Sequence, residues 1–378
     1  MKFTTWFAKN AHFLCPGCIP SPQEAVDSNG DLTGIHKYKL RKELGQGYFA
    51  VVREAEDLTT GKIYAAKIVS KKGLSRSKAK LLANEIAVLK KISQLNSHLI
   101  SLTDYYETPD SFYLITEIAK GGELFERIYD RGNYYEKDAA EIVRQILKGV
   151  AYLHENGIVH RDLKPENILF ETEDEDSNLV IADFGLARLI DDSNPQVLQT
   201  ACGTMGYIAP EVLKRTSYGR PVDMWAIGVI TFFLLCGYCP FDRDSPNEEV
   251  KAIQNCDYSF SPTFYWNNIS NEAKDFISHL LVLAPEKRWT AREALKSEWM
   301  DKFYTLSLSE SETISLPDLL PAIRQNPQAR QRFRKVVNAI RVVSHLRNQS
   351  ISSGKSIKSP ISPTLITPDE HTPLLNGK

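Results

Sequence analysis

The chain of 378 residues has the size of a two-lobed globular unit with tails, and 42% hydrophobic with 25% charged residues is typical of a cored protein. A formal net charge of −1 argues against a nucleic-acid partner, because it provides no overall field that attracts phosphates. Six cysteines do not form a disulfide framework in a chain of this length, and the start lacks the apolar core of a signal peptide. We therefore expect a cytoplasmic protein, with access to the nucleus left open.

In chain order, residues 1–37 are expected to be irregular, because prolines and glycines punctuate them. Between residues 38 and 118, short apolar runs predict strands, and one helix is expected over about 81–92. From 119 to 299 helical patterns dominate. Strands followed by helices predict an α+β fold with a small β-rich N-lobe and a larger helical C-lobe.

One stretch of the chain is free of charge between Asp223 and Asp242 and is largely apolar. A hydropathy scan alone would also permit a membrane span here. Pro240 near the end of the stretch, and the absence of a flanking basic cluster, favour a helix buried in the centre of a large domain. We therefore predict no membrane span.

A glycine-rich loop lies between two strand-like runs, in Leu44-Gly45-Gln46-Gly47-Tyr48-Phe49-Ala50-Val51-Val52. Two glycines at this spacing let the backbone amides of a hairpin approach phosphate oxygens closely. Downstream, Lys67 stands in a predicted strand, where its ammonium group could hold phosphates. Glu85 follows on the predicted helix, where a carboxylate could pair with Lys67 and fix its position.

The most specific segment is His160-Arg161-Asp162-Leu163-Lys164-Pro165-Glu166-Asn167, directly after an apolar pair. Asp162 can accept a hydrogen bond from an incoming hydroxyl, and Lys164 can stabilise charge on a moving phosphoryl group. Asn167 and Asp183, the latter sixteen residues further on in Asp183-Phe184-Gly185, supply oxygen ligands of the kind that Mg²⁺ prefers.

Together these segments resemble the signature set of the eukaryotic protein kinases, in the same order and over residues 38–299. Ala209-Pro210-Glu211 resembles the end of the activation segment, and Arg288 is a candidate ion-pair partner of Glu211. The resemblance implies a bilobal protein kinase fold that transfers the γ-phosphate of ATP to a protein hydroxyl. A pseudokinase scaffold, the rival interpretation, would lack Lys67, Asp162 or Asp183, and none is missing.

The resemblance also implies a role for each catalytic residue. Lys67, held by Glu85, would anchor two phosphates, while Asp183 and Asn167 would hold Mg²⁺. Asp162 would orient the hydroxyl and take its proton, and Lys164 favours the serine/threonine class. The implied ATP-binding residues are Leu44, Gly45, Gln46, Gly47, Tyr48, Phe49, Ala50, Val52, Ala65, Lys67, Thr116, Glu117, Ala119, Glu123 and Leu169.

Residues 121–128 are similar to the hinge exit of the calcium/calmodulin-dependent kinase group. Glu123 and Glu166 match positions that face substrate arginines there, so we expect protein substrates with a basic residue three positions before the phosphoacceptor. Thr200 matches the site that an upstream kinase phosphorylates in the type I enzymes, and its phosphate could pair with Arg161. Thr204 is expected to support substrate docking.

The C-terminal part begins with a predicted autoinhibitory and calmodulin-binding segment, residues 300–348, in which 315–328 would block the substrate cleft. From Arg330 to Arg347 it carries six Lys or Arg and no acid, and apolar residues recur at helical spacing. Basic amphipathic helices of this kind are typical of calmodulin targets, of membrane surfaces or of helices packed permanently on a domain. By resemblance to the type I enzymes, the predicted anchors for Ca²⁺/calmodulin are Phe333, Val337, Ile340 and Leu346.

Residues 349–378 are rich in Ser, Thr and Pro and are expected to be a disordered tail. The whole chain is expected to be a monomer. A kinase of the same group that is regulated without calmodulin remains the alternative.

Overall fold

The computed structural model describes residues 34–46, 50–92, 96–190, 205–214, 216, 218–308 and 317–325. Several residues named above lie outside these ranges, among them parts of the glycine-rich loop, of the activation segment and of the calmodulin-binding segment. They are Gly47, Tyr48, Phe49, Thr200, Thr204, Phe333, Val337, Ile340 and Leu346.

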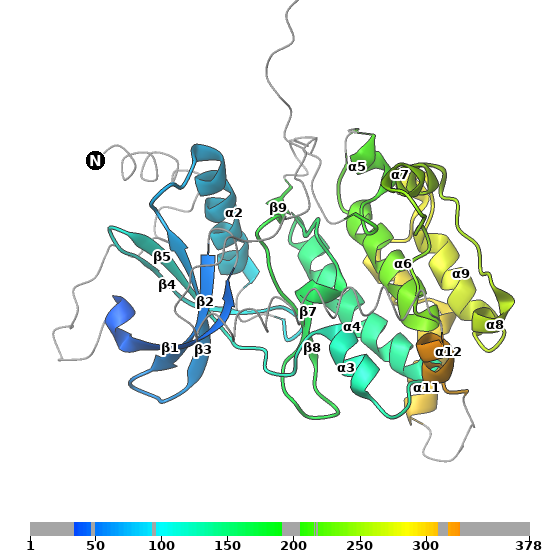
Figure 1. The fold of residues 1–378 in the computed structure, drawn as a ribbon, viewed down its shortest axis with the longest axis horizontal. Helices are drawn as coiled ribbons and strands as arrows, with labels where there is room; N and C mark the ends of the chain where they lie inside the picture. Colours follow the sequence, from blue (N-terminus) through cyan, green and yellow to red (C-terminus); the bar gives the residue numbers. More distant parts are fainter. Residues whose placement is uncertain are drawn as a thin grey trace, which may run out of the picture. The chain divides into compact units, whose positions relative to one another are not determined.

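The N-terminal part of the described chain is an antiparallel sheet preceded by a short 3₁₀ turn, η2 (Gly34–Lys37). Its strands lie in the order β1-β2-β3-β5-β4 and are β1 (Tyr38–Gln46), β2 (Ala50–Asp57), β3 (Ile63–Ser70), β4 (Leu102–Glu107) and β5 (Ser111–Thr116). One long helix, α2 (Arg76–Ile92), packs beside this sheet, as Figure 1 shows. The predicted β-rich N-lobe is thus confirmed.

Helix α2 begins five residues before the predicted start at about residue 81. Ser75 caps it, since its hydroxyl accepts a hydrogen bond from the backbone N–H of Lys78. The first turn carries the exposed Arg76 and Ser77 and the partly exposed Lys78, and its only apolar residue is the small, buried Ala79, so apolar periodicity gives little signal there. The core-facing residues Leu82, Ile86 and Leu89 are buried, as the helical spacing predicts.

The C-terminal part is dominated by helices. The longer ones are α3 (Leu124–Asp130), α4 (Glu136–Glu155), α6 (Pro221–Cys236), α7 (Pro246–Asn255), α9 (Asn271–Leu280) and α11 (Glu298–Leu308). The shorter ones are η3 (Pro165–Asn167), α5 (Pro210–Leu213), α8 (Thr263–Trp266), η4 (Pro285–Lys287), α10 (Ala291–Ala294) and α12 (Leu320–Gln325). Two small two-stranded antiparallel sheets complete it. Strand β6 (Ile158–Val159) pairs with β9 (Arg188–Leu189), and β7 (Ile168–Phe170) pairs with β8 (Leu179–Ile181).

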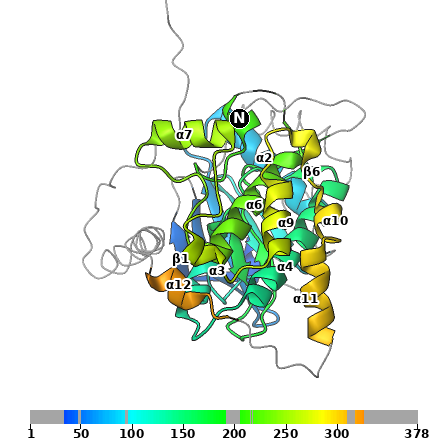
Figure 2. The same cartoon turned by 90° about the vertical axis from the view of Figure 1, so that its right-hand side faces the viewer.

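The charge-free stretch forms α6, and every residue from Val222 to Cys236 is buried. This helix packs against α4 and α9 in the centre of the helical part (Figure 2). The approach to the chain after α9 is close, because a Cβ at Gly228 would lie 2.8 Å from Cδ2 of Leu281. The prediction of a buried core helix is confirmed, and no helix among the residues described could cross a membrane.

Helix α11 crosses the expected end of the kinase domain at residue 299 and continues to Leu308. Met300 and Phe303, beyond that expected boundary, are buried. A chain cut after Trp299 would therefore lose side chains that pack in the core of the helical part.

Candidate active site

The loop between β6 and η3 brings three of the predicted catalytic residues together. Nζ of Lys164 lies 2.8 Å from Oδ2 of Asp162. Nδ2 of Asn167 donates to the backbone carbonyl of Asp162 at 2.8 Å and lies 3.3 Å from its Oδ2. The carboxylate of Asp162 is therefore held by a cation and an amide, at the mouth of the loop where a hydroxyl could reach it.

A buried carboxylate holds the backbone of this loop. Asp223, at the start of α6, accepts hydrogen bonds from the backbone N–H of His160 at 2.9 Å and of Arg161 at 2.8 Å. Nε2 of His154 lies 2.9 Å from the same carboxylate. Burial raises the pKa of Asp223, but these hydrogen bonds and the nearby histidines outweigh burial and lower the pKa below its usual value.

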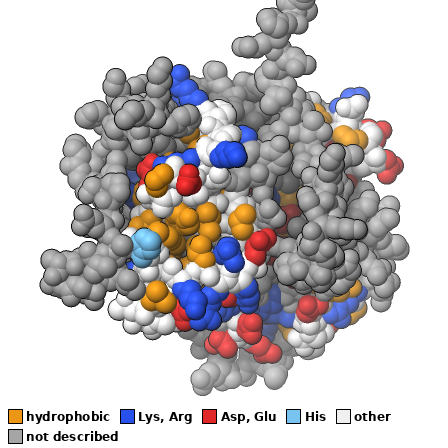
Figure 3. Space-filling model, turned by 60° about the vertical axis from the view of Figure 1, so that its left-hand side comes forward, with side chains coloured by type: hydrophobic (Ala, Val, Ile, Leu, Met, Phe, Trp, Pro, Cys, Tyr) orange, Lys and Arg blue, Asp and Glu red, His pale blue; other side chains and the backbone are white. Residues whose placement is uncertain are grey.

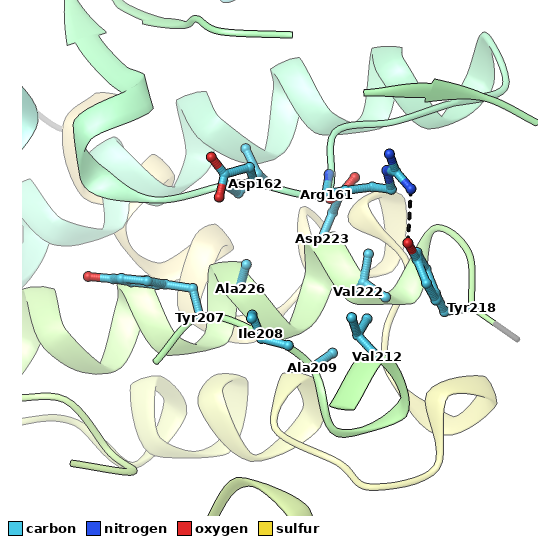
Figure 4. Close-up of a pocket in the computed structure, with 11 residues that line it drawn as sticks. Arg161, Asp162, Tyr207, Ile208, Ala209, Val212, Tyr218, Val222, Asp223 and Ala226 are labelled. Atoms are coloured by element: carbon cyan, nitrogen blue, oxygen red, sulfur yellow. Dashed lines mark hydrogen bonds between the residues drawn. The ribbon is translucent and has the colours of Figure 1, made fainter. Parts of the chain in front are cut away.

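Arg161 has a left-handed backbone conformation, with φ of 69°. Its Nε donates to the carbonyl of Leu186 at 2.7 Å, and its Nη1 donates to the hydroxyl of Tyr218 at 2.9 Å. Figure 4 shows this arginine turned toward Tyr218, while Asp162 lies on the opposite side near Tyr207. Two neighbouring loop residues thus project to different places, one to the reaction centre and one toward the activation segment.

Lys67 connects the sheet to the loop that follows β8. Its Nζ lies 2.5 Å from Oε1 of Glu85 on α2 and 3.8 Å from Oδ1 of Asp183. Burial lowers the pKa of Lys67, but the two carboxylates outweigh it and raise the pKa above its ordinary value. The predicted pairing of Lys67 with Glu85 is confirmed, and it leaves an ammonium that is charged at neutral pH beside Asp183.

Asp183 also has a left-handed conformation, with φ of 59°, and its Oδ1 accepts the N–H of Gly185 at 3.2 Å. Lys67 and this N–H lower the pKa of Asp183 against the effect of burial. Both described side-chain hydrogen bonds of Asn167 use its amide nitrogen, so its amide oxygen is the atom that a cation would take. An ionised carboxylate and an amide oxygen form a donor set that fits a hard divalent cation.

Residues expected to surround adenine and the hinge lie on strands β2, β3, β5 and β7. In the sheet register Val52 is opposite Lys67, and Ala65 is opposite Thr116. Leu169 of β7 forms a bridge with Glu123, just before α3. The N–H of Glu117 donates to the carbonyl of Ser101 at 3.1 Å. The sheet thus presents Val52, Ala65 and Lys67 on one face, opposite the loop that carries Asp162.

A buried ion pair lies in the helical part. The guanidinium of Arg288 donates two hydrogen bonds of 2.7 Å to the two carboxylate oxygens of Glu211. Its Nε donates to the carbonyl of Val282 at 2.7 Å. The predicted pairing is confirmed, and it fixes the end of the activation segment to the chain before α10.

Comparison with known proteins fits this geometry. The model of the protein kinase domain family matches residues 38–300. The chain belongs to the protein kinase family. It is 48% identical over 313 residues to the calcium/calmodulin-dependent protein kinase cmkB of Emericella nidulans, which covers 82% of this chain and 76% of that one. It is 50% identical over 305 residues to the calcium/calmodulin-dependent protein kinase type I of Schizosaccharomyces pombe, covering 81% and 88%.

The similarity extends to mammals, since the chain is 43% identical over 313 residues to the human calcium/calmodulin-dependent protein kinase type 1B, covering 82% of this chain and 87% of that one. The chain is therefore a serine/threonine protein kinase that uses ATP and a divalent metal.

Next to the catalytic loop, the kinase carries a group of carboxylates around the start of α3. Burial, together with Glu126 and Glu166, raises the pKa of Glu123 to about 7. Burial also raises the pKa of Glu166, whose Oε2 is buried with no hydrogen-bond partner among the described residues. Clustered, desolvated carboxylates are costly unless a cation joins them, so this site can bind a guanidinium or an ammonium group.

Sequence reasoning missed Asp223 and Tyr218 as supports of the catalytic loop. A signal for Asp223 existed, because a charge at the edge of a long charge-free stretch needs buried partners. Tyr218 gave no such signal, since tyrosine occurs in many surface loops.

Proposed function

We propose that Ca²⁺/calmodulin switches this kinase on by removing a C-terminal segment that restrains it. The observation that carries the proposal is the docking of residues 317–325 on the helical part. Leu319, Leu320 and Ile323 are buried there. The backbone of Tyr134 exchanges hydrogen bonds with this segment, donating to Asp318 at 2.9 Å and accepting from the N–H of Leu319 at 2.8 Å.

The far end of α12 is held as firmly. Arg324 donates to the backbone carbonyls of Tyr129 and Arg131 at 2.8 Å each, at the end of α3. Ile323 packs so closely on Gly237 that a Cβ there would lie 2.7 Å from its Cγ2. These contacts attach the segment to α3. Helix α3 starts directly after Glu123, which belongs to the carboxylate site.

The names of the relatives support calmodulin as the partner, since each is called a calcium/calmodulin-dependent kinase. The basic, acid-free residues 330–347 begin five residues after the end of α12, and their predicted anchors are Phe333, Val337, Ile340 and Leu346. Calmodulin that engages them would pull on a segment already packed against the kinase.

In the reaction we assign Lys67 to the ATP phosphates, and Asn167 with Asp183 to Mg²⁺, which would neutralise charge on those phosphates when bound. Asp162 orients the substrate hydroxyl and accepts its proton. Lys164, 2.8 Å from that carboxylate, stabilises charge on the phosphoryl group. These residues act by positioning the reactants and by stabilising charge. The contacts of Lys164 and Asn167 with Asp162 hold that residue in place for this role.

For substrates we assign Glu123 and Glu166 to a basic residue three positions before the phosphoacceptor, with Thr204 in the docking turn. The two carboxylates interact with each other and are desolvated, which favours binding of a cation.

For activation we assign Thr200 to an upstream kinase. Arg161 is the expected partner of the phosphate. Its guanidinium now donates to two neutral oxygens, those of Leu186 and Tyr218, and a hydrogen bond to a charged phosphate would be stronger. We place the kinase in the cytoplasm as a monomer.

The test is a peptide kinase assay on the full chain, with and without Ca²⁺/calmodulin. We expect low activity alone and at least a tenfold rise with calmodulin, and Phe333→Ala should weaken the response to calmodulin. Equal activity in both conditions would favour a kinase regulated without calmodulin. An unchanged response of Phe333→Ala would remove the anchor assignment, and activity that survives Asp183→Ala would remove the metal role.

A further inference from the structure

The outward face of the five-stranded sheet carries an apolar cluster that the reaction does not use. Lys67 points toward α2, so its neighbours Ala66 and Ile68 point to the opposite face. The buried members of the cluster are Tyr38, Ala55, Tyr64, Ala66 and Ile115. The partly buried members are Ile35, Leu40, Ile68, Tyr106 and Tyr113.

This face is only partly covered. All members of the cluster belong to strands except Ile35, which lies in η2. Just before β3, the ammonium of Lys62 lies 5.1 Å from the centre of the Tyr64 ring. Figure 3 shows hydrophobic side chains gathered on the sheet side of the molecule, with Lys and Arg side chains beside them. Five of the ten apolar side chains on this face remain partly exposed, and an apolar face that is only partly covered can serve as a docking surface.

A polar group on the same face also needs a partner. Arg53 of β2 is opposite Ala66 in the register, and directly opposite residues point to the same face. Its Nε is buried and has no hydrogen-bond partner among the residues described. A carboxylate is the acceptor that satisfies a guanidinium N–H best.

The chain itself supplies a segment with matching chemistry. Residues 1–33 end directly before Gly34, the first residue of η2, and so one residue before Ile35 of the cluster. Their first part is rich in large apolar side chains, namely Phe3, Trp6, Phe7, Phe13 and Leu14. Their last part contains the only acids, Glu24, Asp27 and Asp31. The residues between Leu14 and Gly34 can span up to roughly 60 Å, which is enough to reach any part of the face.

We propose that residues 1–33 dock on this face of their own chain. The aromatic side chains cover the cluster around Ile68 and Tyr113, and an acid from the later part of the segment accepts the Nε hydrogen of Arg53. The segment thereby braces the sheet that carries Lys67 from the side opposite α2. This docking does not depend on calmodulin.

The test uses the full chain with Phe7 replaced by the photo-crosslinker p-benzoylphenylalanine. After illumination at micromolar concentration, we expect crosslinks within one chain, on outward-facing residues such as 64, 68, 106 or 113. Ile68→Asp should lower their yield at least fivefold. The same probe at Leu365, in the other terminal region, is the control and should not mark this face.

A mixture of isotope-labelled and unlabelled chains separates the outcomes. Crosslinks between copies would assign the face to a second molecule, and crosslinks elsewhere, or none on the sheet, would also overturn the proposal. If Ile68→Asp does not fold, the double variant Trp6→Ser, Phe7→Ser should still lower Tm by several degrees. The matched pair Leu365→Ser, Ile366→Ser should leave Tm unchanged, and equal effects of both pairs would contradict docking.

Discussion

The cleft and the interior of the helical part each contain an ion pair between a basic residue and a glutamate. In the cleft, Lys67 makes one contact of 2.5 Å with Glu85, and its side chain is 30% exposed. In the interior, Arg288 makes two hydrogen bonds of 2.7 Å with Glu211, and its side chain is fully buried. In the first pair the cation of Lys67 remains accessible to a ligand. In the second pair the guanidinium of Arg288 is buried and holds two segments of the chain together.

The difference shows how an ion pair with a glutamate can serve catalysis in one place and stability in another. Lys67 has a further carboxylate, Asp183, at 3.8 Å, and its side chain is partly exposed. Arg288 is enclosed by Glu211 and by the carbonyls of Val282 and Pro221. Loss of the first cation should therefore affect catalysis, and loss of the second should affect folding.

The largest expected effect is on stability. Arg288→Ala leaves a buried carboxylate without its partner and should cost about 3–5 kcal/mol in free energy of unfolding. In a domain of this size Tm should fall by roughly 10 °C, measured by calorimetry. Arg292→Ala is the control, because Arg292 pairs with Glu155 at the surface and should cost less than about 1 kcal/mol. Equal shifts in both variants would break the comparison.

Lys67→Met should lower kcat/KM about 100- to 1000-fold, because a preorganised cation at the phosphates is lost. Its Tm should change much less than that of Arg288→Ala. Lys71→Met is matched to it, since Lys71 pairs with Glu107 at 2.7 Å just beyond the same strand, outside the cleft. The account is contradicted if Lys67→Met keeps more than a tenth of the activity.

Glu85→Gln should have a smaller effect, about tenfold in kcat/KM, which is the value of roughly one charged hydrogen bond. The loss is limited because Asp183 still attracts the ammonium of Lys67. A double-mutant cycle with Lys67→Met measures this, and the two effects should be far from additive. Additive losses would mean that Glu85 acts independently of Lys67.

The smallest effect concerns pH. Because the pKa of Glu123 is raised to about 7, roughly a tenth of it is ionised at pH 6 and roughly nine tenths at pH 8. Only the ionised form attracts a substrate cation, so kcat/KM for a peptide with an upstream arginine should rise several-fold over this range, relative to a peptide with alanine there. Glu123→Gln should abolish the difference, and a variant that keeps it would exclude Glu123 as the titrating group.

The sequence alone predicted those features that depend on the type and spacing of side chains. The pairing of Lys67 with Glu85 and the burial of α6 both follow from residue type and spacing, and both are confirmed. The predicted start of α2 was wrong by five residues, because three of the four residues in its first turn are polar and the fourth is the small Ala79, so periodicity gives little signal there.

Other features depend on hydrogen bonds to backbone N–H and C=O groups, which every sequence contains and which therefore leave no pattern in it. Arg324 binds backbone carbonyls at the end of α3, and Asp318 binds a backbone N–H, so no side-chain pattern indicated where residues 317–325 would dock. The support of the catalytic loop by Asp223 likewise depends on backbone N–H groups brought close by the fold.

The activity of Ile323→Asp in the presence of a calcium chelator shows whether the docked C-terminal segment restrains the kinase. Ile323 is buried against Gly237 and lies outside the cleft, so a carboxylate there should release the segment and leave the reaction centre intact. The account predicts that this variant, without calmodulin, reaches most of the calmodulin-stimulated activity of the unmodified chain. A variant that folds with the same Tm and stays as inactive as the unmodified chain would contradict it.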